Sequence, residues 1–319
     1  MINFIIRKIL ALIPMLVVIS FLIFLGVELM PGDAVDFMIS PEALSTVSPA
    51  ELEALRDELG LNDPFIVRYF IWLANILRGD FGYSLQSGVP VSQLMANTLP
   101  ATLELTVAAL LISTLLGSLL GVVSALRKGS IADNVLTVAG MIGVAIPQFL
   151  FGLVMIVVFV FNLEWLPVGG RMTPGRELFF QRLEYLVLPA VVLGLALTAG
   201  VMRYSRASML DSLNKDYIKT ARSKGLKEWR INLIHGLRVA MTPVAVLIGF
   251  RLPMLIGGAV VIEQVFQWQG VGQLFVMAVR SQNTPIIMMI AFFSVLMVLV
   301  SSILVDIVTA ILDPRVKLS

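Results

Sequence analysis

The chain has 319 residues, of which 58% are hydrophobic and 14% are charged, and its mean hydropathy is +0.93. An ordinary soluble domain carries about 25% charged residues, so this composition excludes that class and indicates an integral membrane protein. The formal net charge is +2, and the sequence lacks the interleaved aromatic and basic residues of a nucleic-acid-binding surface, so we expect no nucleic-acid partner.

Six apolar segments are long enough to cross a bilayer as helices, which takes about 20 residues each. They cover roughly Ile9–Met30, Leu103–Leu126, Val135–Phe161, Leu186–Met202, Val239–Ile262 and Ile286–Leu312. The first segment follows Arg7 and Lys8, as in a secretory signal, but it is longer than a signal's apolar core and no Ala-x-Ala-like cleavage site follows it. We therefore predict an all-α membrane protein with six transmembrane helices, the first of them uncleaved.

The distribution of lysine and arginine predicts the orientation, because positively charged connections stay in the cytoplasm. Basic residues precede the first helix, separate the second from the third and follow the sixth. Between the fourth and fifth helices nine basic residues stand against three acidic ones, whereas between the first and second helices three basic residues stand against nine acidic ones. We expect both termini in the cytoplasm and the long first connection outside.

The chain divides into three predicted parts. Residues 1–30 form the cytoplasmic N terminus and the first transmembrane helix, residues 31–100 form an extracytoplasmic helical loop, and residues 101–319 form a core domain with the other five helices. The loop is too long to be a mere connection. It serves either as a docking surface for another protein or as a cap over the helix ends, and the sequence leaves both readings open.

The loop carries its own helical signals. Ser48 and Glu51 have the spacing of a capping box, and Pro49 stands at the first helical position between them. A second piece, Pro64–Leu77, places aromatic and aliphatic residues on one face at helical spacing. We expect two short helices in this loop.

Catalytic and metal-binding patterns are missing from the sequence. None of the seven lysines follows a glycine, so there is no P-loop for ATP, and His235 is the single histidine, too few for a zinc protease. Cysteine is absent, which excludes disulfides and thiolate chemistry. We expect no catalytic residue, metal or cofactor in this chain.

Ionisable residues within the predicted helices are costly and often functional. Arg251 lies near the middle of the fifth helix, Glu263 closes that helix, and Asp306 lies toward the cytoplasmic end of the sixth. Arg251 is either a residue of a transport pathway or a structural ion pair, within the chain or with a neighbouring subunit. An ATP-independent secondary transporter is a distant alternative, since such proteins need ion-coupling residues in the membrane and often show inverted repeats.

The segment Asp216–Val244 is the most basic of the chain. Either Asn214 or Asp211 is a candidate helix cap, and Gly225 is a natural helix stop. We predict two short helices that are basic outside and apolar on one face, a shape that suits a groove on a partner protein. The alternative is an interfacial helix held by anionic membrane lipid.

The string KTARSKG, Lys219–Gly225, resembles the Glu-Ala-Ala-x-x-x-Gly (EAA) loop of bacterial ABC importer permeases. Lys219, Thr220 and Ala221 take the Glu-Ala-Ala positions, and Gly225 takes the glycine position. Further strings that resemble the dipeptide/oligopeptide/nickel permease family, in order along nearly the whole chain, lie at Phe21–Asp33, Leu77–Leu105, Leu163–Arg171 and Val261–Leu274. The start of the chain resembles the first permease of such a pair.

The resemblance implies the type I ABC importer permease fold and a binding-protein-dependent importer in a bacterial or archaeal cytoplasmic membrane. The implied partners are a second homologous permease, two ABC ATPase subunits that bind ATP and Mg, and an extracytoplasmic solute-binding protein. Di- or oligopeptides are the implied cargo, with nickel chelates, glutathione or oligosaccharides as alternatives.

The family's cytoplasmic loop is a coupling helix that lies in a cleft of an ATPase subunit, which here corresponds to a segment at about 211–235. The implied coupling residues are Asp216, Tyr217, Lys219, Thr220, Ala221, Arg222, Lys224, Gly225 and Leu226. Arg251 and the string QWQ, which replaces a common Trp-Pro pair, depart from the family pattern. The candidate residues of the translocation path are Arg251, Glu263, Gln267 and Trp268.

Overall fold

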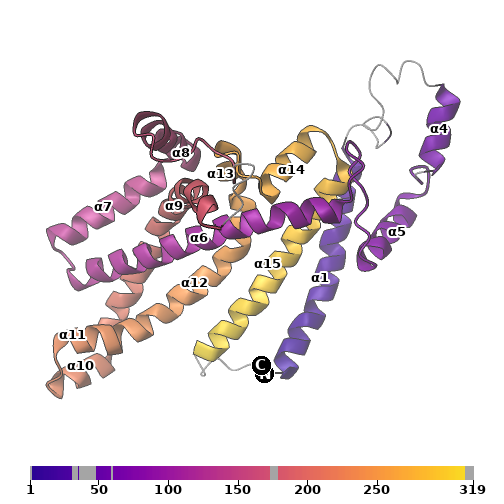
Figure 1. The fold of residues 1–319 in the computed structure, drawn as a ribbon. Helices are drawn as coiled ribbons and strands as arrows, with labels where there is room; N and C mark the ends of the chain where they lie inside the picture. The colour runs from indigo at the N-terminus through magenta and orange to yellow at the C-terminus, as the bar shows by residue number, and fades with distance from the viewer. Residues whose placement is uncertain (1, 31–34, 36–47, 59, 173–178, 313–319) are drawn as a thin grey trace. The chain divides into compact units, whose positions relative to one another are not determined.

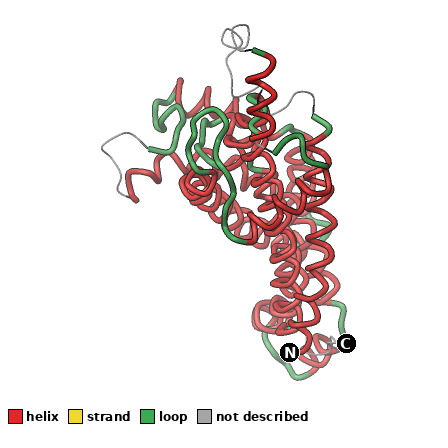
Figure 2. The backbone as a smooth tube through the Cα atoms, turned by 90° about the vertical axis from the view of Figure 1, so that its right-hand side faces the viewer, coloured by secondary structure: helices red, strands yellow, loops and turns green. Residues whose placement is uncertain are grey.

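The computed structural model describes residues 2–30, 35, 48–58, 60–172 and 179–312. Helices make up almost all of this described chain (Figure 2), as the sequence predicts. The chain forms two compact units, Met1–Pro100 with Gln273–Leu299, and Ala101–Gly272 with Val300–Ser319. Part of the predicted extracytoplasmic loop (31–34, 36–47 and 59) and the basic C-terminal residues Arg315 and Lys317 lie outside the described residues.

Five helices of the described chain are long and apolar enough to cross a membrane. A bent pair of helices gives a sixth membrane span if the two helices are counted as one span. With that pair included, the predicted number of six is confirmed. The five helices, labelled in Figure 1, are α1 (Ile2–Glu28), α6 (Val91–Leu126), α9 (Phe179–Leu213), α12 (Leu237–Gly258) and α15 (Thr284–Leu312).

The bent pair consists of α7 (Ile131–Ala145) and α8 (Gln148–Ile156), which continues into the π-helix η1 (Val157–Asn162). The two halves meet at an angle of 96°. Pro147 causes the break, because a proline disfavours helical geometry in the residue before it, and Ile146 is indeed extended with φ −80° and ψ 124°. The prediction of one continuous helix over Val135–Phe161 is therefore wrong at this point.

In the first unit, the two predicted loop helices are confirmed as α4 (Pro49–Glu58) and α5 (Phe65–Leu77). The capping box begins α4: the backbone N–H of Ser48 donates to Glu51 Oε2 at 2.9 Å, and the N–H of Glu51 donates to Ser48 Oγ at 3.3 Å. These bonds with Ser48 lower the pKa of Glu51 below its usual value.

Helix α5 packs against α1 through aromatic side chains. Phe21 and Phe24 of α1 contact the rings of Phe65 and Tyr69 of α5 edge-on or tilted. The hydroxyl of Tyr69 also lies 2.9 Å from Ser20 Oγ, in a buried hydrogen bond. The apolar face predicted for this loop helix is thus buried against the first membrane-spanning helix.

The opposite face of α5 is also apolar, since Ile66, Val67, Phe70 and Ile71 are exposed in this chain. Arg68, the charged residue of α5, forms an ion pair with Glu28 of α1.

In the second unit, glycines let α6 and α9 approach closely. A Cβ atom at Gly117 would lie 2.6 Å from Val201 Cβ, and one at Gly121 would lie 2.5 Å from the carbonyl oxygen of Met202. The small-xxx-small spacing of these two glycines therefore does permit the close helix contact that it predicts.

Helix α9 extends beyond the predicted segment Leu186–Met202 and continues to Leu213, so Arg203 and Arg206 lie on the helix rather than in a connection. Arg206 forms a salt bridge of 2.8 Å with Asp133 of α7, whose side chain is 5% exposed. Sequence reasoning missed this ion pair. It ties the bent pair to α9.

Candidate functional site

The basic segment folds into a helical hairpin, which we call the basic hairpin, over residues 215–236. It consists of α10 (Asp216–Ser223), the single turn α11 (Glu228–Arg230) and the π-helix η2 (Ile231–Gly236), which leads into α12. The residue that caps α10 is Lys215, without a side-chain hydrogen bond. The prediction of a cap from Asn214 or Asp211 is therefore wrong, whereas the predicted pair of short helices is confirmed.

Gly225 ends α10 with a Schellman motif. Its N–H donates to the carbonyl of Arg222 at 2.9 Å, and the N–H of Leu226 donates to the carbonyl of Ala221 at 3.3 Å, as that motif requires. The φ angle of Gly225 is +72°, in the left-handed region that side chains other than glycine rarely adopt. A Cβ atom here would meet open space, so the constraint comes from the backbone conformation alone.

A small apolar core holds the two arms of the hairpin together. Ile218 and Ile231 are fully buried, Ala221 is 7% exposed, and Leu226 packs against them. Ala221 therefore faces the inside of the hairpin. The burial of an alanine leaves little room for a larger side chain between the two arms.

The outer surface of the hairpin combines charge with exposed apolar side chains. Arg222 makes two hydrogen bonds with the carboxylate of Glu228, of 2.8 and 3.3 Å, and this contact raises the pKa of Arg222. Lys219 pairs with Asp216 at 2.9 Å. Tyr217, Trp229, Leu233 and Ile234 are exposed. Exposed apolar side chains beside charged ones are typical of a protein-binding surface and also of a surface at the membrane interface.

Ser212 fastens the hairpin to the helix that precedes it. The buried hydroxyl of this residue on α9 lies 2.6 Å from the hydroxyl of Tyr217 and donates to the carbonyl of Gly236 at 2.9 Å. One turn earlier, Ser208 donates to the carbonyl of Ala240 on α12 at 2.8 Å. A displacement of the hairpin is therefore passed to α9 and α12 together.

Two of the predicted translocation residues lie in a buried polar junction, formed by Ala101, Thr102, Glu263 and Trp268. The hydroxyl of Thr102 donates to Glu263 Oε1 at 2.7 Å and accepts the N–H of Val271 at 2.8 Å. The indole of Trp268 donates to the carbonyl of Ala101 at 2.8 Å. Glu263 and Trp268 have no exposed surface. A role in translocation stays a prediction for both residues. In this conformation their hydrogen bonds join Ala101 and Thr102 of α6 to α13 (Val260–Val265) and to the residues that follow it.

Gln267 and Arg251, the other two predicted translocation residues, are more exposed than Glu263 and Trp268. Gln267 is exposed, has a positive φ of 51°, and donates from Nε2 to the carbonyl of Gln264 at 2.8 Å. Arg251 is half-buried on α12 and donates from Nη1 to the carbonyl of Leu197 on α9 at 2.9 Å. Of the four, Glu263, Gln267 and Trp268 lie within one short stretch of the chain, whereas Arg251 bonds to α9.

Sequence reasoning missed an ion-pair cluster next to the junction. Arg171 binds Glu104 of α6 through two hydrogen bonds of 2.8 and 3.1 Å, and Arg182 reaches the same carboxylate at 3.2 Å. Nearby, the N–H of Gly170 donates to the carbonyl of Phe266 at 3.0 Å. In the sequence these three residues are recognisable only as charges close to the ends of apolar segments. Their positions do not show that Glu104 pairs with Arg171 and Arg182.

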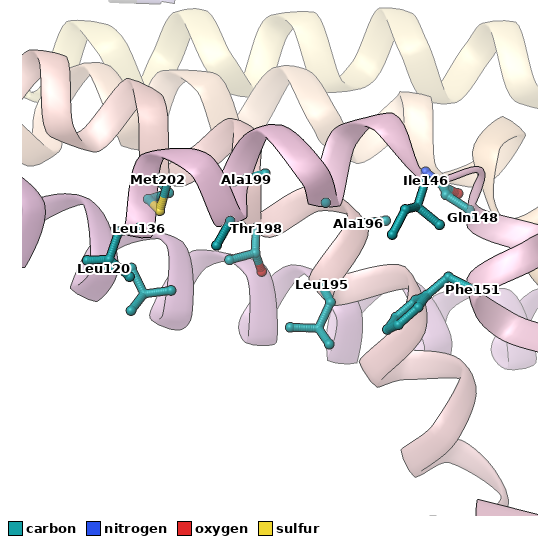
Figure 3. Close-up of a pocket in the computed structure, with 13 residues that line it drawn as sticks. Leu120, Leu136, Ile146, Gln148, Phe151, Leu195, Ala196, Thr198, Ala199 and Met202 are labelled. Atoms are coloured by element: carbon teal, nitrogen blue, oxygen red, sulfur yellow. The ribbon is translucent and has the colours of Figure 1, made fainter. Parts of the chain in front are cut away.

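A cavity of about 250 Å³ lies between α6, α7, α8 and α9 (Figure 3). Leu120, Leu136, Phe151 and Leu195 are among the residues that line the cavity. The hydroxyl of Thr198, which also lines it, donates to the carbonyl of Gly194 at 2.8 Å. None of the predicted coupling or translocation residues lines it. An apolar lining suits hydrocarbon better than a charged solute.

Within the described residues, no group of three or more histidine, aspartate or glutamate side chains is placed to hold a metal ion. The apolar spans and the basic hairpin define a multi-pass helical membrane protein with a candidate docking element. The fold is similar to that of the MetNI methionine ABC transporter in inward-facing conformations, with a TM-score of 0.54 and 17% identity over 70% of this chain and 97% of that one.

Comparison with protein families identifies the chain. The family described as binding-protein-dependent transport system inner membrane component matches residues 117–318, and the model of its N-terminal part matches residues 1–106. The chain belongs to this family and is a multi-pass permease protein of the cytoplasmic membrane. The family resemblance and the location expected from the sequence are confirmed.

Two relatives are similar over nearly their full length. The oligopeptide transport system permease protein AppB of Bacillus subtilis is 43% identical over 98% of this chain and 99% of its own. The glutathione transport system permease protein GsiC of Escherichia coli is 34% identical, over 99% of each chain.

Proposed function

We propose that the chain is the membrane-spanning subunit of an ATP-driven importer of di- or oligopeptides, and that the basic hairpin receives the motion of an ATPase subunit. The single observation that carries this proposal is the hairpin, a rigid element with an exposed apolar surface that is bonded to two membrane-spanning helices. In this assembly the chain pairs with a second homologous permease, and two ATPase subunits bind and hydrolyse ATP with Mg.

The construction of the hairpin suits the transmission of force. The Schellman turn at Gly225 and the core around Ile218 and Ile231 fix the angle between its two arms. Ser212 joins both arms to α9. Because no flexible connection intervenes, a push on α10 is expected to change the packing of α9 against α12 instead of bending the hairpin.

The surface of the hairpin suggests how an ATPase subunit is held. Trp229 is 59% exposed and Leu233 is 51% exposed, one helical turn apart, and aromatic side chains of this kind are the usual anchors of protein interfaces. The surrounding Lys219, Lys224 and Arg230 are exposed, so a partner cleft with an apolar floor and an acidic rim fits this surface.

The proposed cargo follows from the relatives and from the orientation expected for the chain. The more similar relative is named for oligopeptides, and GsiC is named for glutathione, itself a peptide. A binding protein outside the cell delivers the peptide, and both termini of the chain lie in the cytoplasm, on the same side as the hairpin. Nickel chelates and oligosaccharides are the alternative cargoes.

The test is purification of the chain in mild detergent with whatever binds to it, for the unaltered chain and for Trp229→Ala with Leu233→Ala. We expect the unaltered chain to retain a second permease and ATPase subunits. The double variant is expected to remain in the membrane and to lose the ATPase subunits. Trp165→Ala is the matched control, because Trp165 is 70% exposed and lies outside the hairpin.

Two outcomes count against the proposal. A homo-oligomer of the unaltered chain without any ATPase subunit contradicts the proposed function. Full retention of the ATPase subunits by the double variant contradicts the role of the hairpin and leaves the function standing.

A further inference from the structure

Arg251 brings a guanidinium to the middle of the membrane-spanning region. Its Nη1 donates to the carbonyl of Leu197 at 2.9 Å, and Leu197 lies at the centre of the apolar stretch Arg182–Leu213 of α9. A charged side chain at this depth is costly. Such residues line a cavity or pathway or bind an opposite charge.

The structure leaves room for this guanidinium on α9. Gly200 lies one turn after Leu197, and a Cβ atom on Gly200 would collide with Nη2 of Arg251. Any other residue at position 200 would therefore displace the charged group. The guanidinium therefore occupies space that the missing side chain of Gly200 leaves on α9.

No carboxylate within the described part of the chain neutralises Arg251. The salt bridges of the second unit engage Arg171, Arg182, Arg206 and surface residues of the hairpin region, but not Arg251. Arg203 on α9 adds a like charge that acts on Arg251. Arg206, only three residues further along α9, shows the contrast, because it is paired with Asp133.

The donors of Arg251 are only partly used. A guanidinium has five N–H donors in a planar fork that matches a carboxylate, and the Leu197 carbonyl takes a bond from one nitrogen. The side chain is half-buried, and no carboxylate among the described residues pairs with it, so donors remain for a further acceptor. Arg203 is exposed and adds a second positive charge beside it.

We propose that Arg251, supported by Arg203, is an anion site that binds the carboxylate of the solute during its passage through the membrane. The inference rests on the proposed function and narrows its substrate class to solutes with a free carboxylate, such as unmodified peptides. Because α9 and α12 are both bonded to the basic hairpin, motion of the hairpin shifts the Leu197 carbonyl and Gly200 relative to Arg251. The affinity of the site for a carboxylate then changes during the transport cycle.

The direct test is chemical labelling of arginines in the purified complex with phenylglyoxal, read by mass spectrometry. Trialanine and trialanine amide, which differ only in the C-terminal charge, are the added probes, and exposed Arg127 is the internal reference. We expect trialanine to slow the labelling of Arg251 by roughly tenfold or more, as for a charge-assisted hydrogen bond, and the amide to have no effect.

Two labelling results overturn the proposal. Equal labelling of Arg251 with and without trialanine shows that no solute carboxylate binds there. Protection of Arg251 before any peptide is added, and lost in a complex without the second permease, assigns the carboxylate to that subunit instead.

Uptake into proteoliposomes provides a second measurement. Arg251→Gln is expected to reduce trialanine uptake by roughly tenfold and to leave uptake of the amide unchanged, while Arg251→Lys, which keeps the charge, retains part of the preference. Equal loss of both peptides contradicts a carboxylate site. If the unaltered complex imports neither peptide, the proposed cargo fails, and the labelling experiment still decides whether Arg251 binds a carboxylate.

Discussion

The indole Nε1 of Trp268 donates a hydrogen bond of 2.8 Å to the carbonyl oxygen of Ala101, although 167 residues separate the two in the sequence. Trp268→Phe removes a buried hydrogen bond to the Ala101 carbonyl, which lies inside α6, and the loss is expected to destabilise the protein by about 0.5–1.5 kcal/mol. The measurement is the thermal midpoint of the complex in detergent, followed by size-exclusion chromatography after heating.

Trp165→Phe is the control for this substitution, because Trp165 is 70% exposed and lies outside the hairpin. It is expected to leave the midpoint unchanged. Equal midpoints for Trp268→Phe and the unaltered protein would mean that the bond to Ala101 contributes nothing to stability.

The left-handed conformation of Gly225 leads to a graded prediction. Gly225→Asn is expected to retain most ATP-driven uptake, Gly225→Ala less, and Gly225→Val little or none, because asparagine tolerates positive φ best and a β-branched residue least. The order is measured as uptake in proteoliposomes at equal amounts of assembled complex. Normal uptake by Gly225→Val would remove the turn from the coupling mechanism.

Ala221 lies in the core of the hairpin, so Ala221→Arg is expected to abolish uptake by forcing the two arms apart. Hydrogen exchange of the 215–236 region, followed by mass spectrometry, is expected to become faster in this variant. Thr220→Arg is the matched control. Thr220 is the preceding residue and is exposed, so this substitution adds the same positive charge without disrupting the core. Unchanged exchange in Ala221→Arg would contradict the assigned role of this core.

Glu104 accepts hydrogen bonds from both Arg171 and Arg182. Glu104→Gln removes the negative charge that both guanidinium groups share, and it is expected to cost about 1–3 kcal/mol of stability. The same thermal midpoint measures the loss. Glu53→Gln is the control, because its ion pair with Arg56 is exposed and such pairs contribute little; equal effects of both substitutions would contradict this assignment.

The sequence predicts those features that depend on neighbours along the chain. The apolar runs, the capping box at Ser48 and the helix stop at Gly225 follow from local composition, and the structure has all of them. The break before Pro147 was also readable, because proline restricts the residue that precedes it. Hydropathy alone does not register a single proline in a long apolar run, and the break was missed for this reason.

Features that depend on tertiary contacts were not predictable. The sequence identifies Glu263 and Arg251 as unusual charges within apolar segments. Their hydrogen-bond partners, Thr102 and Leu197, are distant from them in the chain. The expectation that Glu263 lines a pathway came from its position in a helix. Its contacts with Thr102 could be found only by knowing how α6 and α13 pack.

The π-helix η2, between the hairpin and α12, has a geometric consequence. A π-helical turn contains one residue more than an α-helical turn, so Ile231–Gly236 holds a surplus residue next to the proposed docking surface. Conversion of this turn to α-helical geometry advances the hairpin by one residue, which is a rotation of about 100° and a translation of about 1.5 Å along the α12 axis. The number of residues in this turn therefore sets which side of the α12 axis the docking surface faces, and deletion of one residue within Ile231–Gly236 would turn that surface away from its present direction.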